Sequence, residues 1–512
     1  MDTKALRQKV LDLAIRGKLV PQDTNDEPAS VLLERIRQQK QQMVKDGKLK
    51  AKDIKNDTII FVGEDNLHYE KFADGGVKCI EDEIPFELPD GWAWARFSTI
   101  TINRDSERKP ISSSQRTGVE KIYDYYGASG KIDKIDKYIF CERLLLIGED
   151  GANLVTRSKP IAFFAEGLYW VNNHAHCIDS PDKLLLEYLC FYINAISLEK
   201  YVTGSAQPKM TQDNMNSILI PLPPYNEQKR LSQHLDEIMA MVDRIEIGKI
   251  ESIELISKAK SQILDLAIRG KLVPQDPNDE PASVLLERIR AEKEDLIKQG
   301  KIKRDKKESV IFKGEDNSYY EKMADGKLHC LDDQLTFELP DGWEWCNLSM
   351  IGTTNIGLTY RPTDIEPGGI MVLRSCNIVN DQFDLSDLVR VKTTVRENQF
   401  AQKNDILICA RNGSRSLVGK CALIPDLGEP ASFGAFMAIY RTEYFEFIVH
   451  YLRSSFFRSV FDDSNSTAIN QLTQDMLKRA IVPLPPLSEQ RRIVEAIGAM
   501  LFELNQIEKS LS

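Results

Sequence analysis

The chain has 512 residues, of which 42% are hydrophobic and 28% are charged. This composition supplies apolar material for two or more folded domains and excludes a largely disordered protein. The N-terminus is a charged amphipathic segment without the apolar core of a signal peptide, and no apolar run approaches the ~18 residues of a membrane span. We therefore expect a cytoplasmic protein. The nine cysteines include no Cys-x-x-Cys pair, which favours reduced thiols and gives no structural zinc motif.

The net charge of -10 is concentrated in two places. Residues 56–90 carry ten acidic residues against two lysines, and residues 308–341 carry nine against three. The remainder of the chain is slightly positive. Although no strongly basic domain is present, this distribution does not exclude DNA as a partner.

Two helices are expected at the start of the chain. Gly17, with Pro21 beyond it, has the position of a glycine just after the end of the first helix. Asp26 and Pro28 predict the cap and the first turn of a second helix that ends near Gly47. We expect the second helix to pack on the first.

Residues 95–209 mix short β-rich runs with loops and end in a helix. We predict strands within 138–147 and 161–171 and a helix over 184–198. Basic, amide and aromatic side chains here can contact bases and phosphates, with a solvated surface role as the alternative for each one. The DNA-contact candidates of this block are Arg104, Arg108, Lys109, Arg116, Tyr125, Tyr126, Lys131, Arg157, Lys159, Asn172, Asn173, Gln207 and Lys209.

Two motifs near the end of this block do not predict catalysis. His174 and His176 alternate along a strand with Cys177 on the opposite face, and no partner pair follows, so we expect no metal. Residues 222–225 (Leu-Pro-Pro-Tyr) resemble the Asn-Pro-Pro-Tyr of amino-methyltransferases but lack its asparagine, and a proline stop before a helix explains them. No glycine-rich loop for S-adenosylmethionine and no GxxxxGK[ST] for ATP occurs. We expect no catalytic residue and no cofactor in this chain.

Residues 227–270 are predicted to form one long helix. Apolar residues recur at steps of four and three, which indicates a coiled-coil seam that is interrupted at Lys249 and Ser252. From 231 to 266 this helix would span about 54 Å, a length typical of a spacer. The seam residues are Leu231, Leu235, Ile238, Val242, Ile245, Ile256, Ile263 and Leu266.

The chain then repeats itself. Residues 11–37 recur at 264–290 with one difference, Thr24 against Pro277. Residues 61–97 recur less strictly at 312–348, and residues 211–230 recur at 473–492. Between these similar segments lie two blocks that do not match, 95–209 and 347–471. Similar frames around divergent blocks predict one scaffold that presents two different recognition surfaces.

The second block has β-rich runs at 370–373, 405–410 and 420–424 and a helix over 444–460. Residues 411–415 (Arg-Asn-Gly-Ser-Arg) are its strongest DNA-contact prediction, because a glycine-containing loop with two guanidinium groups can approach a backbone closely. The candidates of this block are Tyr360, Arg361, Arg374, Asn377, Arg411, Asn412, Arg415, Lys420, Asn470 and Gln471.

The two ends of the chain reproduce the central seam. The C-terminal segment matches its first half and the N-terminal segment matches its second half, so we predict that the ends abut as a split helix packed antiparallel against the central one. A coiled-coil homodimer through the same seam is the alternative. The residues concerned are Ile493, Ile497, Met500, Leu504, Ile507, Leu6, Val10 and Leu13.

The paired LDLAIRGKLVPQD and FELPDGW segments and the IPLPPYNEQ and VPLPPLSEQ runs resemble the specificity subunits of type I restriction-modification enzymes. The resemblance covers essentially the full chain. It implies that each variable block is a target recognition domain that reads half of a bipartite site in double-stranded DNA. It also implies that the helices set the spacer and dock two methylation subunits, with restriction subunits completing the complex. S-adenosylmethionine would then bind to the methylation subunits, which modify adenine, and ATP and Mg to the restriction subunits.

The expected fold is therefore α+β, with two globular α+β target recognition domains separated by a long antiparallel coiled coil and related by an internal pseudo-two-fold repeat. A self-contained DNA methyltransferase would need a cofactor loop, and a coiled-coil assembly scaffold would leave the divergent blocks unexplained. The expected domains are an N-terminal helical region (1–55), an acidic linker (56–90), the first recognition domain (91–225), a central helical region (226–307), a second acidic linker (308–341), the second recognition domain (342–486) and a C-terminal helix (487–512).

Overall fold

The computed structural model describes residues 2–117, 120–204, 207–302, 304, 308–462 and 471–511. The chain divides into two compact units, residues 1–248 and 249–512, each with its own hydrophobic core. Within the described ranges, no helix is both long enough and apolar enough to cross a membrane.

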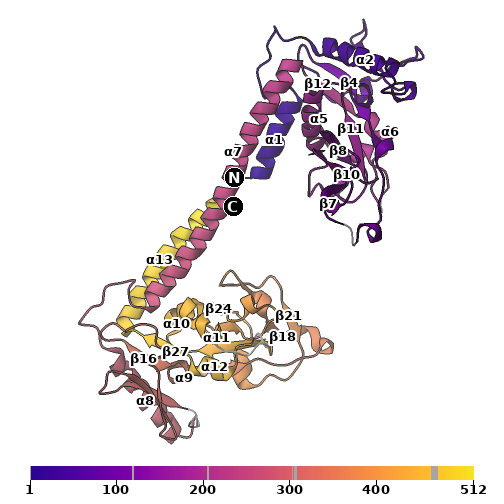
Figure 1. Ribbon diagram of the computed structural model, residues 1–512. Helices are drawn as coiled ribbons and strands as arrows, with labels where there is room; N and C mark the ends of the chain where they lie inside the picture. Colours follow the sequence, from indigo (N-terminus) through magenta and orange to yellow (C-terminus); the bar gives the residue numbers. More distant parts are fainter. Residues whose placement is uncertain are drawn as a thin grey trace. The chain divides into compact units, whose positions relative to one another are not determined.

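Unit 1 is an α+β unit built around a four-stranded sheet of order β5-β11-β8-β9 (Figure 1). Separate sheets of order β1-β2-β3, β12-β4 and β10-β6-β7 complete it. Its helices are α1 (Thr3–Ile15), α2 (Ala29–Lys45), α3 (Phe97–Ile100), α4 (Asn153–Thr156), α5 (Lys183–Ala195), α6 (Gln212–Asn216) and the first part of α7 (Tyr225–Ile268). Its strands are β1 (Ile59–Val62), β2 (His68–Lys71), β3 (Val77–Cys79), β4 (Ala93–Arg96), β5 (Ile102–Asn103), β6 (Tyr123–Gly127), β7 (Gly130–Ile135), β8 (Leu144–Gly148), β9 (Ala162–Ala165), β10 (Tyr169–Val171), β11 (Ala175–Asp179) and β12 (Leu219–Leu222).

Unit 2 repeats this plan around a sheet of order β17-β26-β23-β24. Its other sheets have the orders β13-β14-β15, β16-β27, β21-β18-β25-β22 and β19-β20. Besides the second part of α7, its helices are α8 (Ala282–Lys298), α9 (Leu348–Ile351), α10 (Phe445–Arg453), α11 (Ser455–Asp462), α12 (Gln474–Arg479) and α13 (Leu487–Leu511). Its strands are β13 (Ser309–Lys313), β14 (Tyr319–Met323), β15 (Leu328–Cys330), β16 (Glu344–Asn347), β17 (Thr353–Ile356), β18 (Ile365–Leu373), β19 (Ile378–Val379), β20 (Gln382–Phe383), β21 (Val389–Val391), β22 (Phe400–Ala401), β23 (Ile406–Cys409), β24 (Cys421–Leu423), β25 (Ala431–Phe433), β26 (Met437–Arg441) and β27 (Ile481–Leu484).

The central strand of each main sheet is buried on both faces. In β8, Leu145 and Ile147 join the core on the helix side, whereas Leu144 and Leu146 join the core shared with β6 and β10. Successive side chains of a strand point to opposite faces, so a strand covered on both sides is apolar throughout. The mixed α+β architecture expected for both blocks is confirmed.

The two acidic stretches fold as small sheets. Residues 56–90 contain the antiparallel strands β1, β2 and β3, and residues 308–341 contain β13, β14 and β15. Apolar side chains such as Phe61 (40% exposed) and Val77 (55% exposed) lie on the first sheet among the acidic residues. The domain boundaries placed around these stretches stay a prediction.

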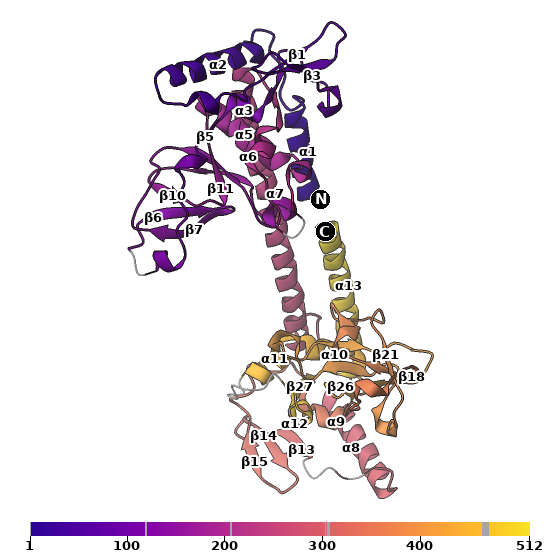
Figure 2. The ribbon, with the colours of Figure 1, turned by 90° about the vertical axis from the view of Figure 1, so that its right-hand side faces the viewer.

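The helix α7 contains 44 residues, a length of about 66 Å. In unit 1, α1 runs antiparallel to α7 (Figures 1 and 2). Arg7 of α1 pairs with Asp243 and Glu246 of α7, whereas Leu11, four residues further along α1, lies beside Leu235 of α7. Higher numbers in α1 thus face lower numbers in α7.

In unit 2, α13 runs antiparallel to the second part of α7. Lys260 pairs with Glu508 at 2.5 Å, and Gln275, just beyond α7, reaches Glu489 near the start of α13 at 3.1 Å. The N-terminal and C-terminal helices therefore each pack on α7, as expected. Met1 and Ser512 lie outside the described residues, so the abutment of the two ends stays a prediction.

Seven of the sixteen predicted seam residues are buried: Leu231, Leu235, Val242, Ile256, Ile493, Ile497 and Val10. The prediction that Leu266 belongs to the buried seam is wrong, because Leu266 is 41% exposed while its neighbours Ala267 and Ile268 are fully buried. The end of α7 packs into the globular core of unit 2 instead of against α13 alone, which moves its buried face.

Three further residues of the predicted seam are exposed instead of buried. Ile245 is 42% exposed, Met500 is 42% exposed and Ile507 is 50% exposed. Ion pairs lie beside Ile245 and Ile507 instead of apolar contacts: Arg7 of α1 pairs with Glu246 of α7, and Lys260 of α7 pairs with Glu508 of α13. The remaining seam residues, Leu6, Leu13, Ile238, Ile263 and Leu504, are half-buried.

Asp26 is not the cap of α2, contrary to the sequence prediction. Pro28 occupies the cap position without a side-chain hydrogen bond, and the Asp26 carboxylate pairs with Arg230 of α7 at 2.6 Å. Asp279 pairs with Arg492 of α13 at the same distance in unit 2. The aspartate stabilises the packing of the loop on the long helix because a guanidinium group lies within reach.

Candidate nucleic-acid interface

The loops that follow β8 and β23 occupy the same place in the two units. The N–H of Met210 donates to the carbonyl of Glu149 at 2.8 Å, and the N–H of Leu472 donates to the carbonyl of Ala410 at 2.7 Å. The N–H of Glu149 donates to the carbonyl of His174, just before β11, at 2.9 Å. The N–H of Ala410 donates to the carbonyl of Phe436, just before β26, at the same distance. These backbone bonds establish a residue-by-residue correspondence between the two loops.

Charged side chains fill this place in unit 1. His176 Nδ1 lies 2.6 Å from Asp105 Oδ2, and His176 Nε2 lies 3.0 Å from a backbone carbonyl. Arg108 contacts Glu149 at 2.6 Å and Asp105 at 3.3 Å, and Lys209 reaches Glu149 at 3.0 Å. We refer to Asp105, Glu149 and His176 as the unit 1 triad.

The unit 1 triad brings together groups that could hold a cation, but its hydrogen bonds do not fit one. Burial raises the pKa of Asp105, and the hydrogen bond and charge of His176 together with Arg108 outweigh that effect, so its pKa is lowered and it is a carboxylate. His176 Nδ1 therefore donates to it, and Nε2 donates to the carbonyl. Both ring nitrogens of His176 face oxygen acceptors in this arrangement, and a metal ion would have to displace these bonds.

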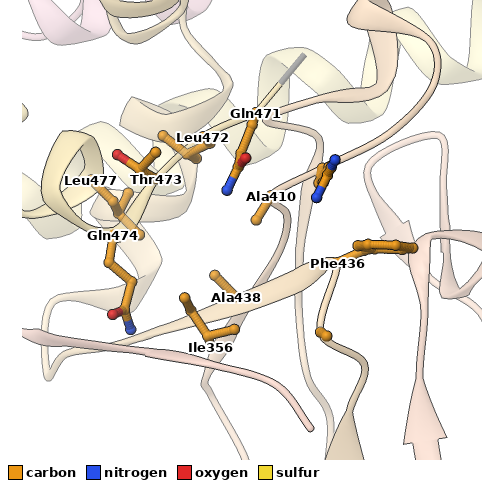
Figure 3. A pocket seen from close by; sticks show the side chains of 11 residues that line it. Ile356, Ala410, Phe436, Ala438, Gln471, Leu472, Thr473, Gln474 and Leu477 are labelled. Atoms are coloured by element: carbon orange, nitrogen blue, oxygen red, sulfur yellow. The ribbon is translucent and has the colours of Figure 1, made fainter. Parts of the chain in front are cut away.

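Apolar side chains replace the triad in unit 2. A cavity of about 230 Å³ lies there, lined on its rim by Arg411, Phe436, Gln471 and Gln474 (Figure 3). The counterparts of the unit 1 triad are Ile356, Ala410 and Ala438, which are smaller or uncharged.

The rim also differs between the units. In unit 1, His174 lies 2.8 Å from the carboxylate of Asp150. Their counterparts in unit 2 are Phe436, which is 61% exposed, and Arg411, whose guanidinium carbon lies 5.7 Å from the Phe436 ring centroid. A histidine and a carboxylate in one unit are thus matched by an aromatic ring and a guanidinium group in the other, which changes the ligands that each rim can attract.

Several predicted DNA-contact residues of the first block have roles in the fold. Arg104 pairs with Glu107 and Glu142, and Arg157 donates to two carbonyls at the end of α5. Tyr125 is 1% exposed and exchanges hydrogen bonds with the backbone of Ile111. Arg108, Arg116, Tyr126 and Asn172 also make internal contacts.

The second block divides in the same way. Asn377 is fully buried and donates to two backbone carbonyls, Lys420 donates to the carbonyl of Ile378 at 2.9 Å, and Arg374 pairs with Asp387. Tyr360 packs against a small core cluster, and Asn412 accepts from the Ser414 N–H. DNA contact by these side chains would require the loss of bonds that hold the loops in place.

Other predicted residues remain accessible. The exposed candidates are Lys109, Lys131, Lys159, Asn173, Gln207, Lys209, Arg361, Arg411 and Arg415. The structure brings Arg411 and the half-buried Gln471 together at the cavity in unit 2 through a backbone bridge. Asn470 lies outside the described residues. Base or phosphate contact by any of these candidates stays a prediction.

Sequence reasoning did not single out Asp105, Glu149, Phe436 or Gln474. The signal was present in the internal repeats. The offset of 251 residues between 61–97 and 312–348 places Asp105 opposite Ile356, and the offset of 262 residues between 211–230 and 473–492 places Lys209 opposite Gln471. The sequence could not show that these positions converge, since they come from separate strands.

A family model described as the type I restriction modification DNA specificity domain matches residues 100–255 and 340–511, more than half of the chain. The chain belongs to the type I restriction-modification specificity subunits. This specificity subunit is 29% identical to the type I restriction enzyme EcoAI specificity subunit of Escherichia coli and 27% identical to the EcoEI specificity subunit of the same organism. Each alignment covers 99% of this specificity subunit and 90% of the relative.

A solved structure from work on the complex assembly and conformational transition of the type I R-M system has the same fold. It covers 83% of this specificity subunit and 94% of the matched chain, with a TM-score of 0.51 and 16% sequence identity. At this identity the likeness concerns the fold alone. The family and the fold expected from the repeated motifs are thereby confirmed.

Proposed function

We propose that this specificity subunit recognises a bipartite sequence in double-stranded DNA, with each variable block reading one half, and catalyses no reaction itself. One observation carries the proposal. Contacts of the frame recur between the two units, as in Asp26 with Arg230 and Asp279 with Arg492, whereas the loops at the ends of their main sheets carry unlike side chains. Selection for two different ligands on one scaffold produces this pattern, and sequence is read by side chains at base edges.

The charge distribution supports this division of labour. The exposed basic candidates Lys109, Lys131, Lys159, Arg361 and Arg411 lie in the variable blocks, where they can position the protein on phosphates. Lys131 contacts Asp124 at 2.6 Å, and such an exposed pair contributes little to stability and can exchange for a phosphate.

The long helix supports a role as spacer and assembly site. Apolar residues on α7 are exposed in both units, among them Met241 (53%), Ile247 (54%) and Leu255 (64%), and Phe502 of α13 is 59% exposed. Exposed apolar side chains in such a series mark protein interaction sites. In our proposal they dock two methylation subunits, which bind S-adenosylmethionine and modify adenine N6, and restriction subunits add ATP and Mg chemistry. We place the complex in the cytoplasm.

The experiment is a block exchange. Residues 95–209 are replaced by the corresponding block of another family member, and the methylated sequence is mapped by long-read sequencing in cells that contain the partner subunits. Only one half of the site should change. The reciprocal exchange of 347–471 is the matched control and should change the other half. A change in both halves after either exchange contradicts the two-reader proposal.

A further inference from the structure

The cavity in unit 2 combines an apolar interior with a polar and aromatic rim. Figure 3 shows Ile356 and Ala438 at the lower side of the space, Gln471 at the upper side and the amide of Gln474 to the left, level with Ile356. Leu477 adds to the apolar part. Among the described residues that line the cavity, Arg411 on the rim is the one with a charged side chain. Such a site favours a ligand with a small apolar group next to hydrogen-bonding atoms.

The rim restricts the ligand to an anionic or π-rich molecule. Arg411 is exposed and lies over Phe436, which is itself exposed. The amide of Gln474 donates to the carbonyl of Thr354 at 3.3 Å, whereas the amide of Gln471 has no hydrogen-bond partner in the described part of the chain. Gln471 is therefore available to a ligand at the mouth of the cavity.

We propose that this cavity receives the C5-methyl group of one thymine in the second half-site, while Gln471 binds the adenine of the same base pair. The proposal rests on the proposed DNA-reading function. Thymine is the base that presents an apolar methyl group in the major groove, beside its O4 acceptor. A glutamine amide matches N6 and N7 of adenine, so the two contacts together select one A·T pair in one orientation.

The size of the cavity agrees with this occupant. An apolar cavity of about 150 Å³ accommodates benzene, so about 230 Å³ admits the methyl edge of a pyrimidine ring without rearrangement. Arg411 at the rim is placed to approach a neighbouring base edge or phosphate, and either contact would hold the base pair in register.

Unit 1 supplies an internal comparison. The unit 1 triad fills the corresponding place with ionised side chains, and a methyl group gains nothing from contact with them. A thymine methyl contact at this position is therefore a property of unit 2 only. The two half-sites should differ in their dependence on methyl groups.

The test uses the complex with its methylation subunits and duplexes that carry the mapped target site. Each thymine of the second half-site is replaced in turn by deoxyuridine, which removes the methyl group and preserves base pairing. One replacement should weaken binding about fourfold, the factor that corresponds to ~0.8 kcal/mol for one buried methyl group. A duplex with 7-deaza-adenine opposite that thymine should also bind more weakly, because it lacks the N7 acceptor for the amide of Gln471.

Two protein variants locate the effect. Ala438→Leu fills the cavity, so it should weaken binding to the thymine duplex and abolish the difference between thymine and deoxyuridine. Gln471→Ala, at the rim, should remove the sensitivity to 7-deaza-adenine even if the cavity variant folds poorly. Lys392→Ala, an exposed residue elsewhere in unit 2, is the control.

The outcomes separate this inference from the proposed function. Specific binding with no deoxyuridine effect in the second half-site, or an effect that persists in Ala438→Leu, overturns the methyl pocket and leaves the DNA-reading function standing. A second half-site without an A·T pair overturns it as well. The absence of any sequence preference overturns both.

Discussion

The indole Nε1 of Trp92 donates a hydrogen bond to Glu227 Oε2 at 3.0 Å, and the equivalent indole of Trp343 donates to Glu489 at 3.0 Å. Both glutamates lie at the start of a long helix, α7 or α13. Each bond ties the tryptophan of an FELPDGW segment to that helix. The recognition block is thereby anchored to the long helix in the same way in both units.

Glu227→Ala should destabilise unit 1, because it leaves the buried indole N–H without an acceptor. We expect a loss of about 1 to 3 kcal/mol in the free energy of unfolding, measured by urea unfolding followed by tryptophan fluorescence. Glu227→Gln keeps an acceptor and should cost less. Glu489→Ala is the matched variant for unit 2, and an unchanged unfolding midpoint in both alanine variants would show that the bond contributes nothing.

Asp57→Asn should flatten the dependence of stability on pH. Burial raises the pKa of Asp57 to about 6, against the opposing effect of Lys40 at 2.7 Å. The folded state therefore holds the proton of the Asp57 carboxyl group more tightly than the unfolded chain does. The contribution of this group to stability is full below about pH 4 and is lost as the pH rises through about 6.

The measurement is the unfolding free energy between pH 4 and about 7, where one proton accounts for a slope of at most ~1.4 kcal/mol per pH unit. The variant should lose this slope. Glu308→Gln is the control, since the side chain of Glu308 in unit 2 is more exposed, 26% against 13% for Asp57. Equal slopes for the wild type and Asp57→Asn would contradict the assignment.

Arg411→Ala should weaken binding of the assembled complex to its target by about 1 to 3 kcal/mol if the guanidinium contacts a base edge. Its side chain is exposed at the rim of the cavity and free to turn from Phe436 toward DNA. Fluorescence anisotropy at fixed salt measures the effect. Arg390→Ala removes a comparable charge that is paired with Glu429 in the same unit, so it should bind normally, and wild-type affinity of Arg411→Ala would remove Arg411 from the interface.

Insertion of one heptad after Ile245, with a matching heptad after Ile507, should lengthen the spacer of the recognised site. Seven helical residues add about 10 Å, which corresponds to about three base pairs. Methylation mapping of the variant measures the spacer, and a three-residue insertion that breaks the heptad register is the control. An unchanged spacer would mean that α7 does not set the distance.

The long helix and the repeated frame could be predicted from sequence because they depend on local periodicity and on identity between segments. Leu231, Val242, Ile256 and Ile493 recur at heptad spacing and are buried. Leu266 follows the same spacing and is exposed, because burial at the end of α7 depends on what packs there. Periodicity cannot report a change of neighbour.

The candidate contact residues were less predictable for a related reason. Residue type suggested Tyr125, Arg157 and Asn377 as readers of DNA, but the tertiary structure uses their polar groups to satisfy buried backbone atoms. A side chain that can bond to a base edge can equally bond to a carbonyl. Only the packed structure determines which partner it has.

The family, the two similar units and the long helix between their variable blocks follow from repeats and short-range patterns in the chain. The meeting of Asp105, Glu149 and His176 in unit 1, and the cavity left by Ile356, Ala410 and Ala438 in unit 2, arise from the folded arrangement. These residues are far apart in the chain and are brought together by the pairing of strands in the main sheets. Strand pairing is non-local, so the difference between the two loops emerges only after folding.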